Sequence, residues 1–207
     1  MTKLLIATRN KAKFDEIASI MWSYKLELKS LNDVNIINYP EETGTTFKDN
    51  AIIKAKYYYK KSKLPTIVDD GGLEIAALNG WPGVSSRRMG DNNVELTDDE
   101  MIAEVLRRMQ GVPMSERQCQ MRVVFALVLL NGEIITSEGV TEGYIATEPY
   151  KKYIPGFPFR SIFYLPKYGK TVSELDGGKV HTDFMKHRKN AIIKLEPYLK
   201  KLSKLNN

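Results

Sequence analysis

Two pairs of neighbouring carboxylates are the first feature of this sequence that could do chemistry. Glu41 and Glu42 precede a Thr-Gly pair, and Asp69 and Asp70 follow a short apolar run and precede two glycines. If folding brings the two pairs together, their like charges repel unless a cation lies between them. Oxygen ligands of this kind suit Mg²⁺, and adjacent carboxylates can also orient an attacking water. The alternative is that residues 69–72 form only a turn, since Asp and Gly are common in turns.

A second group consists of Thr8, Asn10 and Lys13, which follow an apolar run over 3–7. A hydroxyl, an amide, an ammonium and the backbone N–H groups of a helix start can together hold phosphate oxygens. The same residues also fit an ordinary helix N-cap followed by a solvated lysine. The spacing alone leaves both interpretations open.

A third group combines aromatic and basic side chains in the last third of the chain. It comprises residues 156–160, Lys170 and the basic run 186–188. Aromatic rings beside cations can stack on a nucleobase and hydrogen-bond its edge. The alternative is that Phe157 and Phe159 belong to the core and that the basic run is a charged helix start.

These groups need elements that place them at strand ends and helix starts, the positions that face the ligand crevice of open α/β sheets. Hydrophobic spacing and turn residues predict such an alternation. The predicted elements are a strand over 3–7, a helix through Phe14 and Met21, a helix over 45–62, a strand over 66–68 that ends at Asp69, a short apolar run over 73–78, a helix over 98–109 and a final helix over 184–203.

Asn131-Gly132 gives the clearest turn signal of the chain. It separates two β-rich runs, 121–130 and 133–137, and an Asn-Gly pair between strands suits a type I′ hairpin turn. Residues 143–145 are expected to continue the sheet, and 149–171, rich in Pro, Gly and aromatics, to form an ordered loop region. The fold class expected from this order is α/β, in one domain over 1–207.

Composition places the chain among ordinary globular proteins. Of its 207 residues 43% are hydrophobic and 27% charged, and the formal net charge is +6. The single cysteine, Cys119, excludes an intramolecular disulfide and a cysteine metal cluster, and the two histidines lack zinc-ligand spacing. No run approaches the roughly 20 apolar residues of a membrane span, and no secretory signal is present. We therefore expect a cytoplasmic protein with no membrane partner.

Taken in order, these segments resemble the Ham1 / inosine-triphosphatase family, whose bacterial members are called dITP/XTP pyrophosphatases. The resemblance covers nearly the whole chain, and it rests on several motifs in register rather than on any one of them. The matching segments are 8–13 (T/S-x-N-x-x-K), 42–55 (E-x-G-x-x-F-x-x-N-A-x-x-K-A), 68–73 (resembling A-D-D-S-G-L), 78–86 (L-x-G-x-P-G-v-y-S) and 169–175 (G-K-T-x-A-E-L/M).

The resemblance implies hydrolysis of non-standard purine nucleoside triphosphates such as ITP, dITP and XTP to the monophosphate and pyrophosphate. It implies an elongated mixed sheet flanked by helices, two lobes with the nucleotide cleft between them, and commonly a homodimer. Mg²⁺ is the implied cofactor, with Mn²⁺ as the alternative. The implied catalytic residues are Asp70 as the base, Lys54 and Glu42, and the implied metal ligands are Glu42, Asp69 and Asp70. The implied substrate-binding residues are Thr8, Arg9, Asn10, Lys13, Gly71, Phe157, Phe159, Arg160, Lys170, Lys186, His187 and Arg188.

The sequence departs from the family pattern mainly where the base would be read. The family's F-G-[YW]-D-P loop here reads F-P-F-R-S over 157–161, so that Arg160 replaces a carboxylate with a cation. The family's S-H-R begins here with Lys186, and Lys179 is a candidate for the lysine upstream of it. Gly71 replaces a serine, and the family's S-A-R-Y reads S-R-R-M over 86–89.

A buried polar group that faces the wrong kind of partner costs about 1–3 kcal/mol. The exchange of an acceptor for a donor at Arg160 therefore predicts that the preferred base is not hypoxanthine or xanthine bound in the usual pose. Two other functions compete with the leading one. Maf-like nucleotide pyrophosphatases open with S-x-S-x-R, which this chain lacks. A non-catalytic nucleotide- or RNA-binding protein would explain the positive charge, but it has no need of carboxylates beside phosphates, so nucleic acid is not the expected partner.

Overall fold

The computed structural model describes residues 1–86, 95–175 and 186–204. Arg87, Arg88, Met89 and Lys179, named above as departures from the family pattern, lie outside these residues. The chain forms two compact units, each built from separate segments: unit 1 from Met1–Asp70, Val123–Gly139 and Arg188–Asn207, and unit 2 from Gly71–Arg122 and Val140–His187. The single domain expected over 1–207 stays a prediction.

The strands form one seven-stranded sheet in the order β2-β1-β3-β4-β5-β6-β7. Their bounds are β1 (Lys3–Ile6), β2 (Glu27–Lys29), β3 (Thr66–Ile75), β4 (Gln118–Val128), β5 (Ile134–Ile145), β6 (Phe163–Leu165) and β7 (Lys170–Thr171). β1 pairs in parallel with β2 and β3, whereas β6 pairs antiparallel with β5 and β7. The sheet is therefore mixed, which confirms the expected mixed α/β class.

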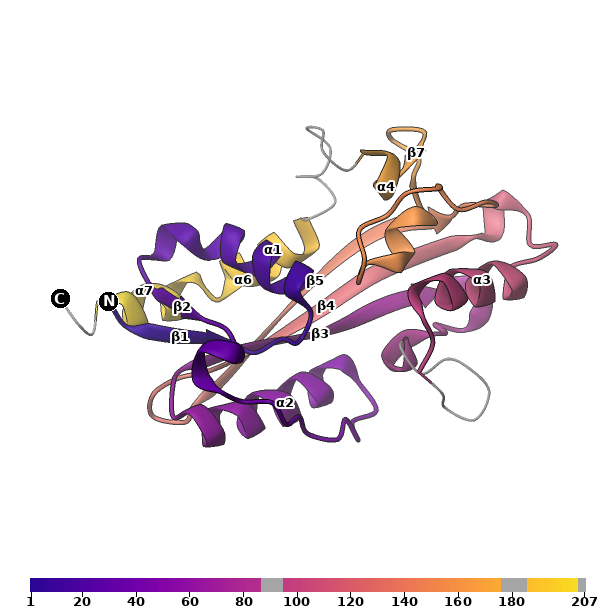
Figure 1. The fold of residues 1–207 in the computed structure, drawn as a ribbon. Helices are drawn as coiled ribbons and strands as arrows, with labels where there is room; N and C mark the ends of the chain where they lie inside the picture. The colour runs from indigo at the N-terminus through magenta and orange to yellow at the C-terminus, as the bar shows by residue number, and fades with distance from the viewer. Residues whose placement is uncertain (87–94, 176–185, 205–207) are drawn as a thin grey trace. The chain divides into compact units, whose positions relative to one another are not determined.

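In unit 1, helices cover both faces of the sheet (Figure 1). Leu4 and Ile6 of β1 pack into a core with α1 (Lys11–Met21), α6 (Lys186–Lys194) and α7 (Glu196–Ser203). Leu5 and Ala7, which alternate with them, pack into a second core under α2 (Phe47–Ser62). Because successive side chains of a strand point to opposite faces, a strand buried on both faces reads as a continuous apolar run. This explains the sequence of β1.

Unit 2 has one large core. The buried side chains of α3 (Asp98–Arg108) pack against Leu73 and Ile75 of β3 and against Phe163 of β6. The short 3₁₀ turn Pro158–Ser161 and α4 (Val172–Leu175) close the same core. α3 begins with a capping box in which Thr97 and Glu100 satisfy each other's backbone N–H groups, which is why the helix starts there.

β3 corrects the expectation of a strand that ends at Asp69. The strand runs without interruption to Ile75, so the interpretation of 69–72 as a turn is wrong. Gly71 and Gly72 are not among the glycines with positive φ, and extended backbone is what a strand requires. The carboxylates therefore lie on the sheet itself and not on a mobile turn.

Two further expectations are corrected by backbone geometry. Gly132 has φ +83°, but Asn131 does not have positive φ, and Gly132 N–H donates to Leu129 O at 2.9 Å. This matches a three-residue loop with a glycine bulge rather than a type I′ turn. The predicted helix over 184–203 is two helices, because Pro197 in the first turn of α7 cannot continue α6. The start of that prediction, 184–185, lies outside the described residues.

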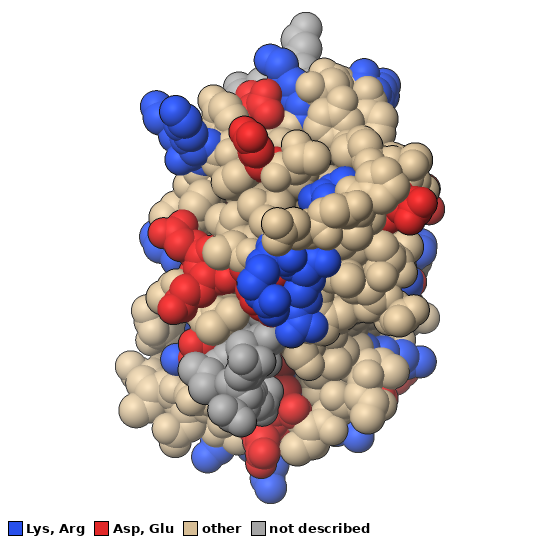
Figure 2. Space-filling view, turned by 90° about the vertical axis from the view of Figure 1, so that its right-hand side faces the viewer, with Lys and Arg blue, Asp and Glu red and all other residues tan. Residues whose placement is uncertain are grey.

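The region 149–171, expected as a loop, also contains the two short strands β6 and β7. Within the described residues, no helix has the length and apolarity needed to cross a bilayer. On the face shown in Figure 2, Lys and Arg side chains lie among Asp and Glu side chains, so both signs of charge are interspersed there.

Candidate functional site

The loop between β1 and α1 carries the first predicted group. Asn10 is the N-cap of α1, where its Oδ1 accepts from Lys13 N–H at 3.2 Å, and its own N–H donates to Thr8 Oγ1 at 3.2 Å. The N-cap interpretation is thus confirmed for Asn10. It is compatible with phosphate binding, because the remaining N–H groups of the first turn still point out of the helix start.

Lys13 turns from this helix toward the sheet. Its Nζ donates to Asp69 Oδ2 at 3.0 Å, which joins the first predicted group to the second. Asp69 is almost fully buried on β3, next to Asp70. Lys13 belongs to the first turn of α1 and Asp69 to a strand inside the sheet. Both elements are rigid, so the backbone holds each partner of this ion pair in place.

Lys54 connects the two carboxylate segments. Its Nζ donates to Asp70 Oδ1 at 2.6 Å and lies 3.4 Å from Glu42 Oε1. The lysine is on α2, the aspartate on β3, and the glutamate on the segment that precedes α2. The suspicion that a cation must lie between these carboxylates therefore holds, and in this structure the cation is the ammonium of Lys54.

Burial and neighbouring charges set the protonation of these groups. Burial raises the pKa of Asp70 above its ordinary value, with help from Glu42 and against the opposing effect of Lys54. Burial also raises the free energy of a charged Asp69, but Lys13 and Arg188 outweigh it and hold the pKa of that carboxyl well below its usual range. Neighbouring carboxylates on one strand thus differ in character: Asp69 is a fixed anion, and Asp70 is the one more ready to take a proton.

The segment that carries Glu42 is fixed to α2 by a close backbone contact. Gly44 N–H donates to Asn50 Oδ1 at 2.8 Å, and Asn50 is buried. A Cβ on Gly44 would lie 2.6 Å from Asn50 Oδ1 and 2.6 Å from Asp49 Cβ, so only glycine fits. This contact gives a physical reason for the E-x-G-x-x-F-x-x-N spacing, which sequence reasoning used only as a match.

Arg188 lies in unit 1 beside Asp69 rather than on the surface. Its Nη2 lies 3.4 Å from Asp69 Oδ2, and its Nη1 donates to Glu16 Oε2 at 2.6 Å. Glu16 is one helical turn beyond Lys13 on α1, and both arginine and glutamate are buried. The result is a chain of alternating charges, Lys13, Asp69, Arg188 and Glu16, that joins α1, β3 and α6.

A divalent ion would find its oxygen ligands around Lys54. In the parts of the chain that the structure describes, no three or more His, Cys, Asp or Glu side chains are arranged to hold a metal. Asp69 already accepts from two cations, whereas Glu42 and Asp70 share one ammonium. The predicted set of three metal ligands stays a prediction, and the two carboxylates around Lys54 are the ones whose chemistry fits Mg²⁺.

The remaining predicted residues belong to unit 2. Arg160 is almost fully buried, and its guanidinium carbon lies 3.9 Å from the centre of the Phe157 ring. Phe159 packs in the core of this unit, as the alternative interpretation expected. The other three differ in exposure: His187 is buried, Lys170 and Lys186 are exposed. Gly71 opens the part of β3 that belongs to this unit.

Sequence reasoning missed the roles of three buried residues, two of which act on these groups. Glu16 pairs with Arg188. In the sequence, its position three residues after Lys13 indicated that the two side chains lie on the same face of one helix. Asn50 fixes the Glu42 segment, as described above. Arg117 is buried and donates to four backbone carbonyls at 2.7 to 3.2 Å, those of Met109, Val112, Ile145 and Ala146. Nothing in the local sequence marks Arg117, because its partners are backbone carbonyls and two of them, those of Ile145 and Ala146, are 28 and 29 residues away along the chain.

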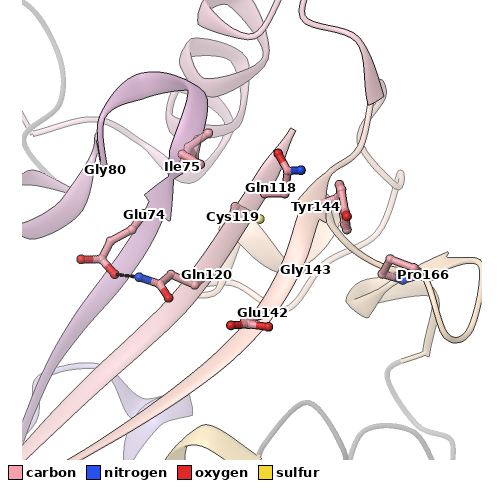
Figure 3. Close-up of a pocket in the computed structure, with 11 residues that line it drawn as sticks. Glu74, Ile75, Gly80, Gln118, Cys119, Gln120, Glu142, Gly143, Tyr144 and Pro166 are labelled. Atoms are coloured by element: carbon pink, nitrogen blue, oxygen red, sulfur yellow. Dashed lines mark hydrogen bonds between the residues drawn. The ribbon is translucent and has the colours of Figure 1, made fainter. Parts of the chain in front are cut away.

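Unit 2 also contains a hollow of about 660 Å³ on the face of β3, β4 and β5 that α3 leaves uncovered (Figure 3). Glu74 accepts from Gln120 Nε2 at 2.7 Å and from Arg122 Nε at 2.8 Å along this face. Gln118, Glu142 and Tyr144 complete its polar lining. None of the predicted site residues is among the residues that line it.

Comparison with known proteins gives matches over nearly the full length. Residues 4–198 match the model of the Ham1 family. A dITP/XTP pyrophosphatase of Halalkalibacterium halodurans is 38% identical over 96% of this chain and 100% of the relative. Another, of Geobacillus kaustophilus, is 36% identical over 95% and 93%.

Solved structures of members of this family also match the chain over nearly its full length. A HAM1 protein from Coxiella burnetii superposes with a TM-score of 0.80 at 35% identity, covering 97% of this chain and 100% of the other. A nucleoside-triphosphatase / dITP/XTP pyrophosphatase from Mycobacterium abscessus has a TM-score of 0.73 at 34% identity, with coverage of 95% and 100%. Because the family model and these relatives match nearly the full length, this chain belongs to the Ham1 family.

Proposed function

We propose that this protein is a nucleoside-triphosphate pyrophosphatase that converts non-standard purine nucleoside triphosphates, such as ITP, dITP and XTP, to the monophosphate and pyrophosphate. Three of the relatives named above are called dITP/XTP pyrophosphatases, and they match 95–96% of this chain. The observation that carries the proposal most directly is the ammonium of Lys54 between Asp70 and Glu42, in the same unit as the loop at Thr8 and Asn10.

The chain's own residues account for the steps that hydrolysis needs. The first turn of α1, with Lys13 and Lys54, neutralises the phosphate oxygens. Asp70 accepts a proton from a water whose oxygen attacks the α-phosphorus, and its raised pKa suits that task. The bond from this phosphorus to the oxygen that bridges to the β-phosphate breaks, and pyrophosphate leaves. Little else is required of the protein in phosphoryl chemistry.

Glu42 and Asp70 are the residues assigned to hold Mg²⁺, together with waters and substrate oxygens. When bound, the ion supplies neutralisation of phosphate charge. Asp69 is assigned a different task, because Lys13 and Arg188 already neutralise its negative charge. Its task is to hold Lys13 in the direction of the phosphates.

Steady-state release of pyrophosphate from a panel of ITP, dITP, XTP, GTP and ATP tests the proposal. ITP or XTP should be cleaved in the presence of Mg²⁺. Asp70→Asn should lower kcat by about 100-fold or more, the usual loss for a positioned base, while the melting temperature stays close to that of wild type. Asp15→Asn, on the exposed face of α1, is the matched control and should leave kcat unchanged. Tight binding of ITP with no product from the wild type would contradict the proposal.

The base preference forms a separate part of the proposal. An arginine offers only donors, whereas the carboxylate of the family pattern offers only acceptors. We therefore propose that Arg160 changes the order of preference among bases, and a panel that also holds modified pyrimidine triphosphates measures it as kcat/KM. A strong preference for ITP and XTP that Arg160→Gln leaves unchanged would contradict this part alone.

A further inference from the structure

The segment 146–157 leads to the residues assigned to the base, and it lacks a ladder or helix to hold it. The structure describes all of this segment, which forms neither helix nor strand between β5 and the 3₁₀ turn Pro158–Ser161. Phe157 is its last residue, and Arg160 lies in the turn that follows. Backbone outside helices and sheets depends on its other hydrogen bonds. Those bonds therefore decide where Phe157 and Arg160 lie.

Asp98, the first residue of α3, holds the peptide group directly before Phe157. Gly156 N–H donates to Asp98 Oδ2 at 2.6 Å. A hydrogen bond to a carboxylate is charge-assisted and roughly twice as strong as a neutral one. Glycine populates positive and negative φ about equally, so a hydrogen-bond partner is needed to select one conformation at Gly156, where φ is +87°.

Asp99 holds the same segment at a second point. Tyr153 O–H donates to Asp99 Oδ1 at 2.7 Å, and this hydrogen bond is the main reason why the pKa of Tyr153 is raised to about 12. The hydroxyl therefore stays protonated, and stays a donor, at neutral pH. The ring of Tyr153 packs against the core of unit 2. Two contacts three residues apart fix the segment more completely than one, because a single contact leaves rotation about it.

Both carboxylates belong to the first turn of a firmly held helix. The cap of α3 is made by Thr97 and Glu100, so it does not require the side chains of Asp98 and Asp99. Val105, two turns along the same helix, is fully buried in the core of unit 2. Acidic residues are common in a first turn because they oppose the helix dipole. In this helix two of them also reach the segment that ends at Phe157.

Phe157 and Arg160 respond to that segment as one group. The guanidinium carbon of Arg160 lies 3.9 Å from the centre of the Phe157 ring, and both side chains are buried. A shift of the peptide between Gly156 and Phe157 therefore displaces the ring together with the donors of Arg160. Hydrogen bonds weaken steeply with distance and angle, so a displaced group distinguishes one base edge from another less well.

We propose that Asp98 and Asp99 are positioning residues for base selection, which fix the segment before Phe157 so that Phe157 and Arg160 meet the nucleobase in one orientation. This inference rests on the proposed function and on the assignment of Arg160 to the base. Asp98 acts through Gly156 N–H and Asp99 through the Tyr153 hydroxyl, and neither has to touch the nucleotide. Selectivity among bases is then set partly by the start of α3.

Steady-state kinetics with the nucleotide panel is the test, with selectivity taken as the ratio of kcat/KM between the best and the poorest measurable nucleotide. Asp98→Ala should raise KM for the best nucleotide and lower the selectivity about tenfold each, the effect of losing one charge-assisted bond, while kcat stays within about twofold. Asp98→Asn keeps an acceptor oxygen and should restore most of both. Tyr153→Phe, which keeps the ring, should lower the selectivity by a smaller factor.

Val105→Ala is the matched control, because it weakens the same helix without removing a bond to the segment. It should lower the melting temperature and leave the selectivity unchanged. Unchanged selectivity in Asp98→Ala, in an enzyme that still releases pyrophosphate, overturns the inference and leaves the proposed function standing. An effect of Asp98→Asn as large as that of Asp98→Ala overturns the role of the hydrogen bond, and an equal loss of selectivity in Val105→Ala overturns positioning in favour of general destabilisation.

Binding measurements keep the inference testable if no nucleotide is cleaved, a result that would itself count against the proposed function. Calorimetric titration should show that Asp98→Ala weakens ITP about tenfold and leaves inorganic tripolyphosphate, which has no base, within about twofold. In hydrogen-exchange NMR the Gly156 amide should exchange faster in Asp98→Ala than in the wild type. Equal weakening of both ligands, or a wild type that binds ITP no more tightly than tripolyphosphate, overturns the inference.

Discussion

At the scale of single residues, the site is defined by how each charge is compensated. Asp69 lies between Lys13 and Arg188, while Asp70, the next residue of the strand, meets Lys54. Side chains of adjacent strand residues point to opposite faces, so two neighbouring aspartates can meet different partners. This separates the carboxylate assigned to structure from the one assigned to catalysis.

Glu16 provides a test of the buried charge network. Glu16→Gln removes a carboxylate that pairs with the buried Arg188, and loss of one partner from a buried pair leaves charge uncompensated. We expect the free energy of unfolding to fall by about 3 kcal/mol, measured by urea denaturation. Asp15→Asn, which breaks the exposed pair with Lys11 on the same helix, should cost less than about 0.5 kcal/mol. Equal losses in the two variants would contradict the importance of the network.

At the scale of elements, the helix starts and the segments before them place the functional side chains. α2 begins at its N-cap Thr46, and the bond from Gly44 to Asn50 ties the preceding segment, with Glu42, to the same helix. One helix therefore positions both residues: Lys54 lies in the middle of α2, and the segment with Glu42 is tied to its N-terminal part through Asn50. A shift of this segment would move Glu42, which we propose as a metal ligand, without touching the core.

Gly44→Ala should show this coupling. The added Cβ meets the side chains of Asn50 and Asp49 at 2.6 Å, so the segment must move. A displacement of about 1 Å at a catalytic group can cost up to 100-fold, and we expect kcat/KM for ITP to fall by about tenfold or more with a small change in melting temperature. Thr43→Ala, at the exposed neighbouring position, is the control and should have little effect. Full activity in Gly44→Ala would show that the position of Glu42 does not depend on this contact.

α3 offers a pH-dependent prediction of its own. Hydrogen bonds from Arg107, and then from Arg108, outweigh burial and lower the pKa of Glu104 to about 2. A carboxyl whose pKa is lower in the folded state stabilises the fold above its unfolded pKa, near 4.5, and this contribution is lost as the pH falls through about 2. NMR titration of the Glu104 carboxyl should give a midpoint well below 4. Glu104→Gln should cost about 0.5–1 kcal/mol at pH 7, a limit set by solvent screening of the exposed Arg107.

At the scale of the whole molecule, the residues proposed for catalysis and the residue proposed to read the base belong to different units. The charged residues around Asp69 and Asp70 all lie in unit 1, and the buried Arg160 on Phe157 lies in unit 2. Each unit has cores of its own, under α1 and α2 in the first and under α3 in the second. The assembly of two chains into a homodimer stays a prediction, which light scattering in solution can test.

Removal of divalent ions should separate folding from function. The cores of both units consist of apolar side chains, so we expect EDTA to leave the melting temperature within about 2 °C while it abolishes pyrophosphate release. Mg²⁺ in excess should restore the rate, and Mn²⁺ should restore it in part. A large drop in melting temperature on chelation would mean that the ion is a structural part of the fold.

The sequence by itself determined the class of the fold and most helices and strands of unit 1, though not β2, and it singled out the polar groups that the structure brings together around Asp69 and Asp70. Those signals are local: apolar periodicity, turn and cap residues such as Asn10, and motifs with fixed spacing. It misjudged 69–72, where Asp and Gly favour a turn but the pairing of β3 within the sheet holds the backbone extended.

Only the tertiary structure decided which charges meet. Lys13 and Asp69 are 56 residues apart, and Glu16 and Arg188 are 172 apart, so no local pattern could pair them. The same holds for Arg9 and Tyr39, whose contact depends on the path of the chain before α2. The physical reason is that an ion pair depends on distance in space, whereas sequence patterns report distance along the chain.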